Sequence, residues 1–205
     1  MIKAIIFDLG NVLVNFDHRI AVRKISPLCA KTEEEIFNFF FDSPLTGLFE
    51  EGKIKPDEFF SEVKKALKLN IDYAAFLPVW NEIFILTDSN RSVYSLAKAL
   101  SKNYRLALLS NINTLHFVYL KDRFPVFDPF HDLLLSFEMK LKKPDARIYK
   151  KALATLAVQP QETFYTDDRP ELIESARALG MQGFVFRGVE QLKTDLLNAG
   201  VKING

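Results

Sequence analysis

Residues 3–11 read KAIIFDLGN, a short apolar run that ends in a charged, turn-forming segment. The apolar run from Lys3 to Phe7 is partly β-branched and predicts a buried strand, and the segment from Asp8 to Asn11 predicts a turn. In open α/β sheets, ligands bind beyond the carboxyl ends of the strands. Asp8 stands at that place, which makes it the first candidate for a functional residue.

Further apolar runs repeat this pattern along the chain. They predict strands at residues 106–109, 133–135, 163–165 and 183–186. Apolar residues at helical spacing separate these runs, for example between Val93 and Leu100. Strands that alternate with helices predict an α/β fold, with a parallel sheet covered by helices on both faces.

The stretch from residue 15 to residue 89 has a different pattern. It shows helical periodicity and no convincing strand run, so we expect a helical module inserted after the first strand. The expected domains are an α/β core of residues 1–14 and 90–205, and a helical cap of residues 15–89. The aromatic residues of the cap are expected in its core rather than around a substrate; they include Phe37, Phe39, Phe40, Phe41 and Trp80.

The composition excludes several classes of protein. The chain has 205 residues, 48% of them hydrophobic, and a formal net charge of +1, so nothing attracts it to nucleic acid or to anionic lipid. Cys29 is the single cysteine, which excludes an intramolecular disulfide. No apolar run is long enough to span a membrane, and Asp8 interrupts the first apolar run where a signal peptide would continue. We expect a cytoplasmic protein, either a monomer or a homodimer.

Polar residues follow the other predicted strands as well. Ser110 and Asn111 follow the second strand, Lys143 lies between the third strand and a helix, and Asp167 and Asp168 follow the fourth. Each of these alone could be a loop or a solvated surface pair. Adjacent carboxylates, however, repel each other unless a cation or water separates them. Together the residues predict one polar rim with carboxylate, hydroxyl, amide and ammonium groups.

Four segments in this order resemble the motifs of the haloacid dehalogenase superfamily. They are FDLGNVL at 7–13, LLSN at 108–111, SFE and KPD within 136–145, and FYTDDRP at 164–170. The resemblance covers essentially the whole chain and is strongest to a phosphatase subgroup. That subgroup includes bacterial sugar-phosphate (glucose-1-phosphate type) phosphatases and the N-terminal domain of epoxide hydrolases. It implies a Rossmann-like parallel sheet of strand order 3-2-1-4-5 with an inserted helical cap.

The resemblance also implies a magnesium-dependent phosphatase for a small phosphate monoester, possible substrates including sugar phosphates. Asp8 would be the nucleophile that forms an aspartyl phosphate, and at an ordinary pKa of about 4 its carboxylate needs no activating base. Mg²⁺ would be held by Asp8, the backbone carbonyl of Gly10 and Asp167. Asp168 would hold either the water shell of the metal or Lys143.

The phosphate group would be bound by the other motif residues. Ser110 would donate a hydroxyl hydrogen bond and the amide of Asn111 a second one. Lys143 would supply positive charge beside the transferred group, and Gly10 would contribute to the same pocket. Ser110 and Lys143 are therefore expected to take part in catalysis together with Asp8.

Position 10 departs from the resembled pattern. Most phosphatases of this superfamily carry an aspartate there, two residues after the nucleophile, which protonates the leaving alcohol and later activates water. Asp17 and His116 are candidate substitutes, and a good leaving group such as the anomeric oxygen of a sugar 1-phosphate would need less acid assistance. The segment around Thr46 and Glu50 resembles the substrate-facing part of the cap.

Three other functions stay open at this point. A 2-haloacid dehalogenase also uses an aspartate nucleophile and lacks the second aspartate, but it needs no metal, so the pair Asp167 and Asp168 would disfavour its anionic substrate. A phosphate-binding module without turnover is conceivable because Gly10 replaces the acid. A phosphomutase is disfavoured for the same reason, since mutases rely on the missing group.

Overall fold

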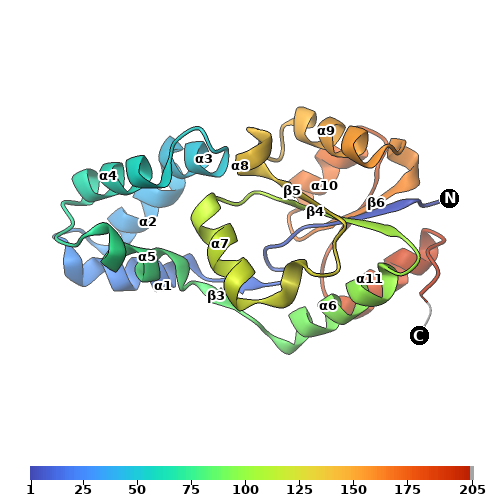
Figure 1. Ribbon diagram of the computed structural model, residues 1–205, viewed down its shortest axis with the longest axis horizontal. Coiled ribbons are helices and arrows are strands. Elements are labelled where there is room, and N and C mark those ends of the chain that lie inside the picture. Colours follow the sequence, from blue (N-terminus) through green and yellow to red (C-terminus); the bar gives the residue numbers. More distant parts are fainter. Residues whose placement is uncertain (204–205) are drawn as a thin grey trace.

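The computed structural model describes residues 1–203, except for the side chain of residue 42. The chain forms two lobes, an α/β core and a helical cap, which lie at opposite ends of the long axis in Figure 1. Among the described residues, every helix is too short or too polar to traverse a lipid bilayer.

The core contains a five-stranded parallel sheet with the order β5-β4-β1-β6-β7. Its strands in this order are β5 (Asp132–Leu135), β4 (Arg105–Ser110), β1 (Ala4–Phe7), β6 (Thr163–Asp167) and β7 (Gln182–Val185). In chain order this is 3-2-1-4-5, so the predicted order is confirmed. The four residues of β1 are fully buried, because neighbouring strands flank it on both edges and helices cover both faces, which explains its unbroken apolar sequence.

Helices cover the two faces of the sheet. On one face, α6 and α11 pack with α7 against Phe7 and Leu108; on the other, α9 and α10 pack against Ile6 and Tyr165 (Figure 1). The helices of the core are α6 (Asp88–Leu100), α7 (Thr114–Arg123), α8 (Ser136–Met139), α9 (Ala146–Leu156), α10 (Pro170–Arg177) and α11 (Val189–Asn198). Short 3₁₀ turns precede two strands, at Pro125–Phe127 and Pro160–Glu162.

The cap consists of five helices around a hydrophobic core of its own. They are α1 (His18–Ile25), α2 (Glu33–Asp42), α3 (Pro44–Glu50), α4 (Pro56–Leu67) and α5 (Tyr73–Asn81), with a 3₁₀ turn at Ser26–Leu28. Phe40, Phe59 and Trp80 are buried together at their centre, as the sequence predicts. Phe41 differs: it is 37% exposed and lines the cavity described below, so the prediction that it belongs to the core of the cap was wrong.

Two chain segments join the cap to the core, and they pair with each other. The strands β2 (Asn15–Phe16) and β3 (Phe84–Ile85) form an antiparallel ribbon. The prediction of an insert without strands was therefore wrong at its two ends, where each strand is too short to show a sequence pattern. Asn90, near the start of α6, donates hydrogen bonds to the backbone of Val12 at 3.1 Å and to the side chain of Asn15 at 3.0 Å. These bonds fix the junction beside the turn that carries Asp8.

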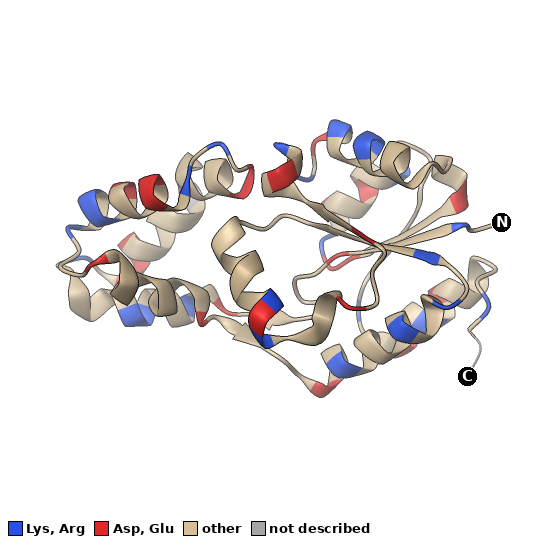
Figure 2. Cartoon of the chain, in the orientation of Figure 1, with Lys and Arg blue, Asp and Glu red and all other residues tan. Residues whose placement is uncertain are grey.

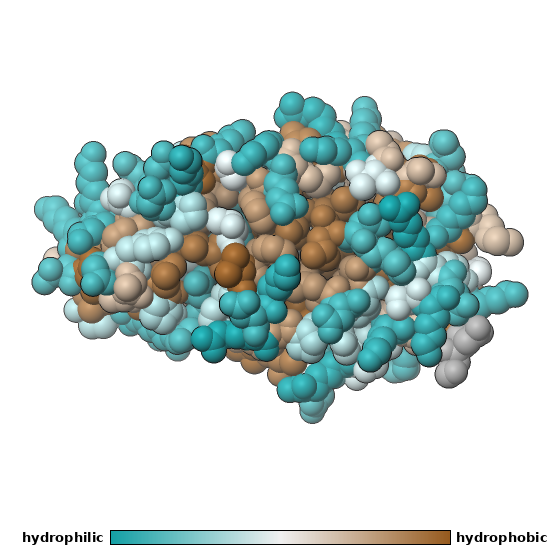
Figure 3. Space-filling model, viewed as in Figure 1, coloured by the Kyte–Doolittle hydropathy of each residue, from teal (hydrophilic) through white to brown (hydrophobic). Residues whose placement is uncertain are grey.

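Charged side chains of both signs are spread over the outer helices (Figure 2), in keeping with the small net charge. The face shown in Figure 3 is polar around its rim and more apolar along its middle, over α7 and the adjoining strands.

Candidate active site

The polar rim predicted from the sequence exists at the carboxyl ends of three adjacent strands. Asp8 follows β1, while Ser110 ends β4 and Asp167 ends β6. Because β1 lies between β4 and β6, the Asp8 side chain sits in the middle of this row. The backbone N–H of Asp8 donates to the carbonyl of Thr166 at 2.9 Å, which extends the parallel pairing one residue beyond β1.

Lys143 joins the rim from the loop before α9. Its Nζ donates to Oδ1 of Asp8 at 2.6 Å, to Oδ2 of Asp167 at 2.6 Å and to the carbonyl of Leu109 at 3.0 Å. An ammonium group has three N–H donors, so each donor has a partner. Lys143 is 3% exposed, and a charge buried to this degree is stable only when it is paired in this way. The ammonium therefore holds the two carboxylates at a fixed separation.

The pKa values of the pair reflect burial and charge. Burial raises the pKa of Asp8 to about 7; Lys143 opposes this shift, and Asp167 adds to it. Burial alone would lower the pKa of Lys143, but Asp8 and Asp167 outweigh it and hold that pKa above the ordinary value. The expectation of an ordinary pKa for Asp8 is thus wrong for the protein without a cation, although a cation at the site would favour the ionised carboxylate.

Asp167 is held on all sides. Its Oδ2 accepts from the hydroxyl of Tyr165 as well as from Lys143, and its Oδ1 accepts from the backbone N–H of Arg169 at 3.0 Å. Asp167 is fully buried at the end of β6. The carboxylate therefore has one defined orientation toward Asp8.

Three carboxylates at this rim could hold a metal ion. One oxygen each from Asp8, Asp167 and Asp168 lie within 4.8 Å of one another. With Lys143 beside them, three negative charges and one positive charge leave a net charge of −2 when all are ionised. Carboxylate oxygens are the ligands that Mg²⁺ prefers, so these three residues suit a hard divalent cation. Asp168 accepts a hydrogen bond from Asn11 Nδ2 at 2.8 Å, and among the described residues it makes no hydrogen bond or ion pair with Lys143, so the prediction that it holds Lys143 was wrong. A role in the water shell of the metal stays a prediction.

Asn111 has a structural task that the sequence did not predict. Its amide nitrogen donates to the carbonyl of Lys143 at 2.9 Å, and its amide oxygen accepts from the backbone N–H of Lys143 at 2.8 Å. This double hydrogen bond fixes the backbone from which the Lys143 side chain extends. One amide hydrogen of Asn111 remains for a phosphate oxygen, and the buried Ser110 lies beside it on the same cavity wall.

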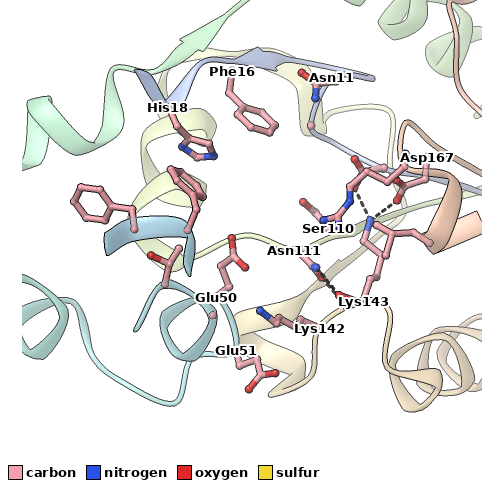
Figure 4. A pocket seen from close by; sticks show the side chains of 18 of the residues that line it. Asn11, Phe16, His18, Glu50, Glu51, Ser110, Asn111, Lys142, Lys143 and Asp167 are labelled. Atoms are coloured by element: carbon pink, nitrogen blue, oxygen red, sulfur yellow. Dashed lines mark hydrogen bonds and ion pairs between the residues drawn. The ribbon is translucent and has the colours of Figure 1, made fainter. Parts of the chain in front are cut away.

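A cavity of about 620 Å³ lies between this rim and the cap (Figure 4). The rim residues line one side, with Lys142 and Arg169 at its edge. The cap lines the other side with Phe16, His18, Phe41 and Glu50.

Sequence reasoning missed Phe16 and His18, although the extended segment of residues 15–17, directly before α1, gave a signal. Alternate side chains of an extended chain point to the same side, so residues 16 and 18 can face the cavity together and residue 17 cannot. Asp17 indeed points elsewhere: it caps α1, and its carboxylate accepts from Arg19 N at 2.9 Å and contacts Arg23. The structure therefore contradicts Asp17 as a substitute acid.

His116 is also excluded as the substitute acid. Its Nδ1 accepts from the amide of Asn113 at 3.0 Å, and its Nε2 donates to the carbonyl of Trp80 at 3.1 Å. Burial lowers its pKa to about 3, so the ring is neutral and both of its nitrogens are occupied. His116 joins the cap to α7, which is the packing role that the sequence favoured.

The space for a side chain at position 10 is filled. A Cβ atom on Gly10 would lie 2.6 Å from Cε1 of Phe16. Carbon atoms in contact prefer about 3.5–4.0 Å, so an aspartate there would displace the ring. The ring of Phe16 thus occupies the space that an aspartate at position 10 would need.

The site combines a candidate nucleophile at the end of the central strand with a carboxylate cluster, a buried lysine and a helical cap. This combination is typical of the haloacid dehalogenase-like hydrolases. The chain belongs to the haloacid dehalogenase-like hydrolase family, which matches residues 2–180. This confirms the family resemblance seen in the motifs.

The chain is also similar to individual proteins of known activity or structure. The chain is 28% identical over 192 residues to the D-ribitol-5-phosphate phosphatase of Bacteroides thetaiotaomicron, which covers 90% of the chain and 91% of the relative. It is 24% identical over 200 residues to the drimenol cyclase drtB of Aspergillus calidoustus; this covers 97% of the chain but 36% of that larger protein. A HAD family enzyme of Bacteroides thetaiotaomicron, solved with magnesium and inorganic phosphate, superposes with a TM-score of 0.81 at 28% identity, covering 91% of this chain and 95% of the other.

Proposed function

We propose that this protein is a Mg²⁺-dependent phosphatase that hydrolyses a small phosphate monoester through an aspartyl phosphate on Asp8. The observation that carries the proposal is the cluster of Asp8, Asp167 and Asp168, with Lys143 paired to the first two, facing the cavity between core and cap. The similarity to a sugar-alcohol phosphatase, and to an enzyme solved with magnesium and phosphate, supports it.

In this mechanism an oxygen of Asp8 attacks phosphorus and the bond to the leaving oxygen breaks, after which water releases phosphate from Asp8. Asp8, the backbone carbonyl of Gly10 and Asp167 would hold Mg²⁺, with Asp168 supporting it. The cation would neutralise charge between the two anions and orient the phosphate oxygens. Lys143 and the hydroxyl of Ser110 would bind the transferred group, while Asn111 holds Lys143 in place and offers its free amide hydrogen.

The cavity supports a small substrate. Its volume of about 620 Å³ lies in the range of small-molecule sites. Its cap wall combines aromatic rings with a carboxylate, a combination that suits a leaving group with hydroxyls and an apolar face. Sugar and sugar-alcohol phosphates are therefore the first substrates to test.

Hydrolysis of para-nitrophenyl phosphate, with Mg²⁺ and with a chelator, tests the proposal. We expect turnover by the wild type that needs Mg²⁺ and that Asp8→Asn abolishes. Asp17→Asn is the matched control, because it makes the same chemical change outside the cavity and asparagine also caps helices. Metal-independent turnover, or turnover that survives Asp8→Asn, would contradict the mechanism. Chloride release from a 2-haloacid without Mg²⁺ would instead identify a dehalogenase.

A further inference from the structure

Phosphoryl transfer to Asp8 leaves the departing oxygen in need of a proton, and position 10 cannot supply it. A small chamber of about 70 Å³ adjoins the main cavity at this position. Gly10, Ser110 and Asn111 line it from the core, and Phe16, His18 and Glu50 from the cap. Two ionisable residues of the cap, His18 and Glu50, therefore lie across the chamber from position 10, where the acid is missing.

Glu50 is the better placed of the two as a proton donor. It ends α3, and Figure 4 shows its carboxylate directed into the cavity toward Ser110 and Asn111. Within the part of the chain that the structure describes, this carboxylate makes no hydrogen bond or ion pair. It is therefore available to donate its proton to a ligand. By contrast, its neighbour Glu51 is paired with Lys53.

Burial favours the protonated form of Glu50 and the deprotonated form of His18. Burial raises the pKa of Glu50, and the positive charges of Lys142 and Arg169 reduce this shift without cancelling it. Burial lowers the pKa of His18 to about 4, which leaves that ring neutral near pH 7. A carboxylic acid with a raised pKa is better suited to general acid catalysis than one with the ordinary value, whereas a neutral imidazole is a poor proton donor.

We propose that Glu50 protonates the leaving oxygen, and so replaces from the cap the acid that position 10 lacks. The proposal rests on the phosphatase function proposed above. As an oxygen of Asp8 bonds to phosphorus, the bond from phosphorus to the leaving oxygen breaks, and its electron pair takes the proton of Glu50. In the second half, Glu50 accepts a proton from water as that water attacks phosphorus and the bond to Asp8 breaks. Glu50 is then protonated again.

The backbone around Glu50 is tied to the core. The hydroxyl of Ser136 on α8 lies 2.6 Å from the carbonyl of Glu50, and Lys140 Nζ donates to the carbonyl of Gly52 at 2.6 Å. These contacts exist only while the cap rests on the core. The acid would thus be delivered together with closure, which also excludes water. With such an acid present, the substrate needs no specially good leaving group.

The test compares two leaving groups in matched variants. Para-nitrophenolate departs without protonation, whereas the alkoxide of glycerol 1-phosphate or ribitol 5-phosphate requires a proton. We expect Glu50→Gln to reduce kcat/KM for the alkyl phosphates about 100-fold or more, the usual range for loss of a general acid. The kcat/KM for para-nitrophenyl phosphate, which reports only on transfer to Asp8, should change by less than about fivefold, which also shows that the variant is folded; kcat should fall for both kinds of ester, because release of phosphate from Asp8 uses Glu50 as the base. Glu62→Gln, at an exposed position of α4 outside the cavity, is the control and should leave both rates near the wild-type values.

Other outcomes overturn the proposal. Equal losses on both leaving groups would make Glu50 a positioning residue, and unchanged rates on both would remove it from the reaction. A selective loss in His18→Gln in place of Glu50→Gln would transfer the role to His18. The pH profile is a second readout: the fall in alkyl-phosphate turnover at high pH should disappear in Glu50→Gln. If wild-type para-nitrophenyl phosphate turnover is itself absent, the phosphatase function fails first.

Discussion

The two walls of the cavity differ in how their polar groups are satisfied. On the core wall, Lys143 donates all three of its hydrogens to fixed acceptors, and Asp167 accepts from three donors. On the cap wall, the buried hydroxyls of Ser43 and Thr46 have no partner among the described residues. The Glu50 carboxylate is equally free. The core wall is thus organised before a ligand arrives, while the cap wall keeps its hydrogen-bonding groups for one.

This difference separates the chemistry from the choice of substrate. Preorganised charges are most effective where charge changes during a reaction, because they need no rearrangement at that moment. Unpartnered groups, in contrast, favour the ligand that satisfies them, since buried polar groups without partners are unfavourable. Variants of the core wall should therefore affect every substrate and also stability. Variants of the cap wall should distinguish one substrate from another.

The largest effect should follow from removing the ammonium in Lys143→Met. Asp8 and Asp167 would then face each other as buried, uncompensated carboxylates, which typically costs about 3–5 kcal/mol of stability. Turnover should fall at least about 10³-fold for all phosphate esters. Urea unfolding should show a smaller loss at pH 5 than at pH 8, because the buried carboxyl of Asp8, whose pKa is raised, takes up a proton as the pH falls. Mg²⁺ should recover part of the stability.

Two results would contradict this account of the core wall. One is a stability loss that is the same at both pH values, which would mean that packing, and not charge, stabilises Lys143. The other is a loss of turnover confined to alkyl phosphates, which would assign to the core wall a property expected of the cap.

The second prediction concerns variants in which an acid is placed on the core, at position 10, in addition to Glu50 on the cap. Gly10→Asp alone should cost about 1–3 kcal/mol of stability, because its Cβ would meet Phe16 at 2.6 Å, and should lower turnover at least about tenfold. Adding Phe16→Ala opens the space, so the double variant should recover alkyl-phosphate turnover. Its rate should then no longer depend on Glu50, which Glu50→Gln in that background measures. Phe16→Ala alone is the control and should keep its dependence on Glu50.

The core wall was predictable from the sequence in a way that the cap wall was not. The central strands β1, β4 and β6 are almost entirely buried, so their apolar runs are nearly unbroken, and each ends at or just before a polar residue that faces the site. The task of Asn111 was not visible, because it depends on a backbone contact with Lys143, which is 32 residues away. Glu50 and Glu51 are adjacent and chemically identical in sequence, and both line the cavity; only the folded cap pairs Glu51 with Lys53 and leaves Glu50 without an ion pair among the described residues.

A third prediction concerns the support of Lys143. Asn111→Ala removes two hydrogen bonds to its backbone, each contributing about 1 kcal/mol net. If both contribute fully to the transition state, kcat should fall about 30-fold for every leaving group. Asn103→Ala, an exposed site, is the matched control. A fall for alkyl phosphates alone would contradict a role in holding Lys143.

The smallest effect on turnover is expected at His116. His116→Gln should keep activity within about twofold, because the ring is neutral and hydrogen-bonded between cap and core. Its effect should instead appear in the acid limb of stability. The folded pKa of about 3 lies below the unfolded value near 6.5, so the unfolded chain binds more protons in this window. Wild-type stability should therefore fall by up to about 1.4 kcal/mol per pH unit from this group as the pH drops below 6.5. Urea unfolding from pH 7 to pH 4.5 should give a flatter slope for His116→Gln, and an unchanged slope would show that His116 takes up no proton on unfolding.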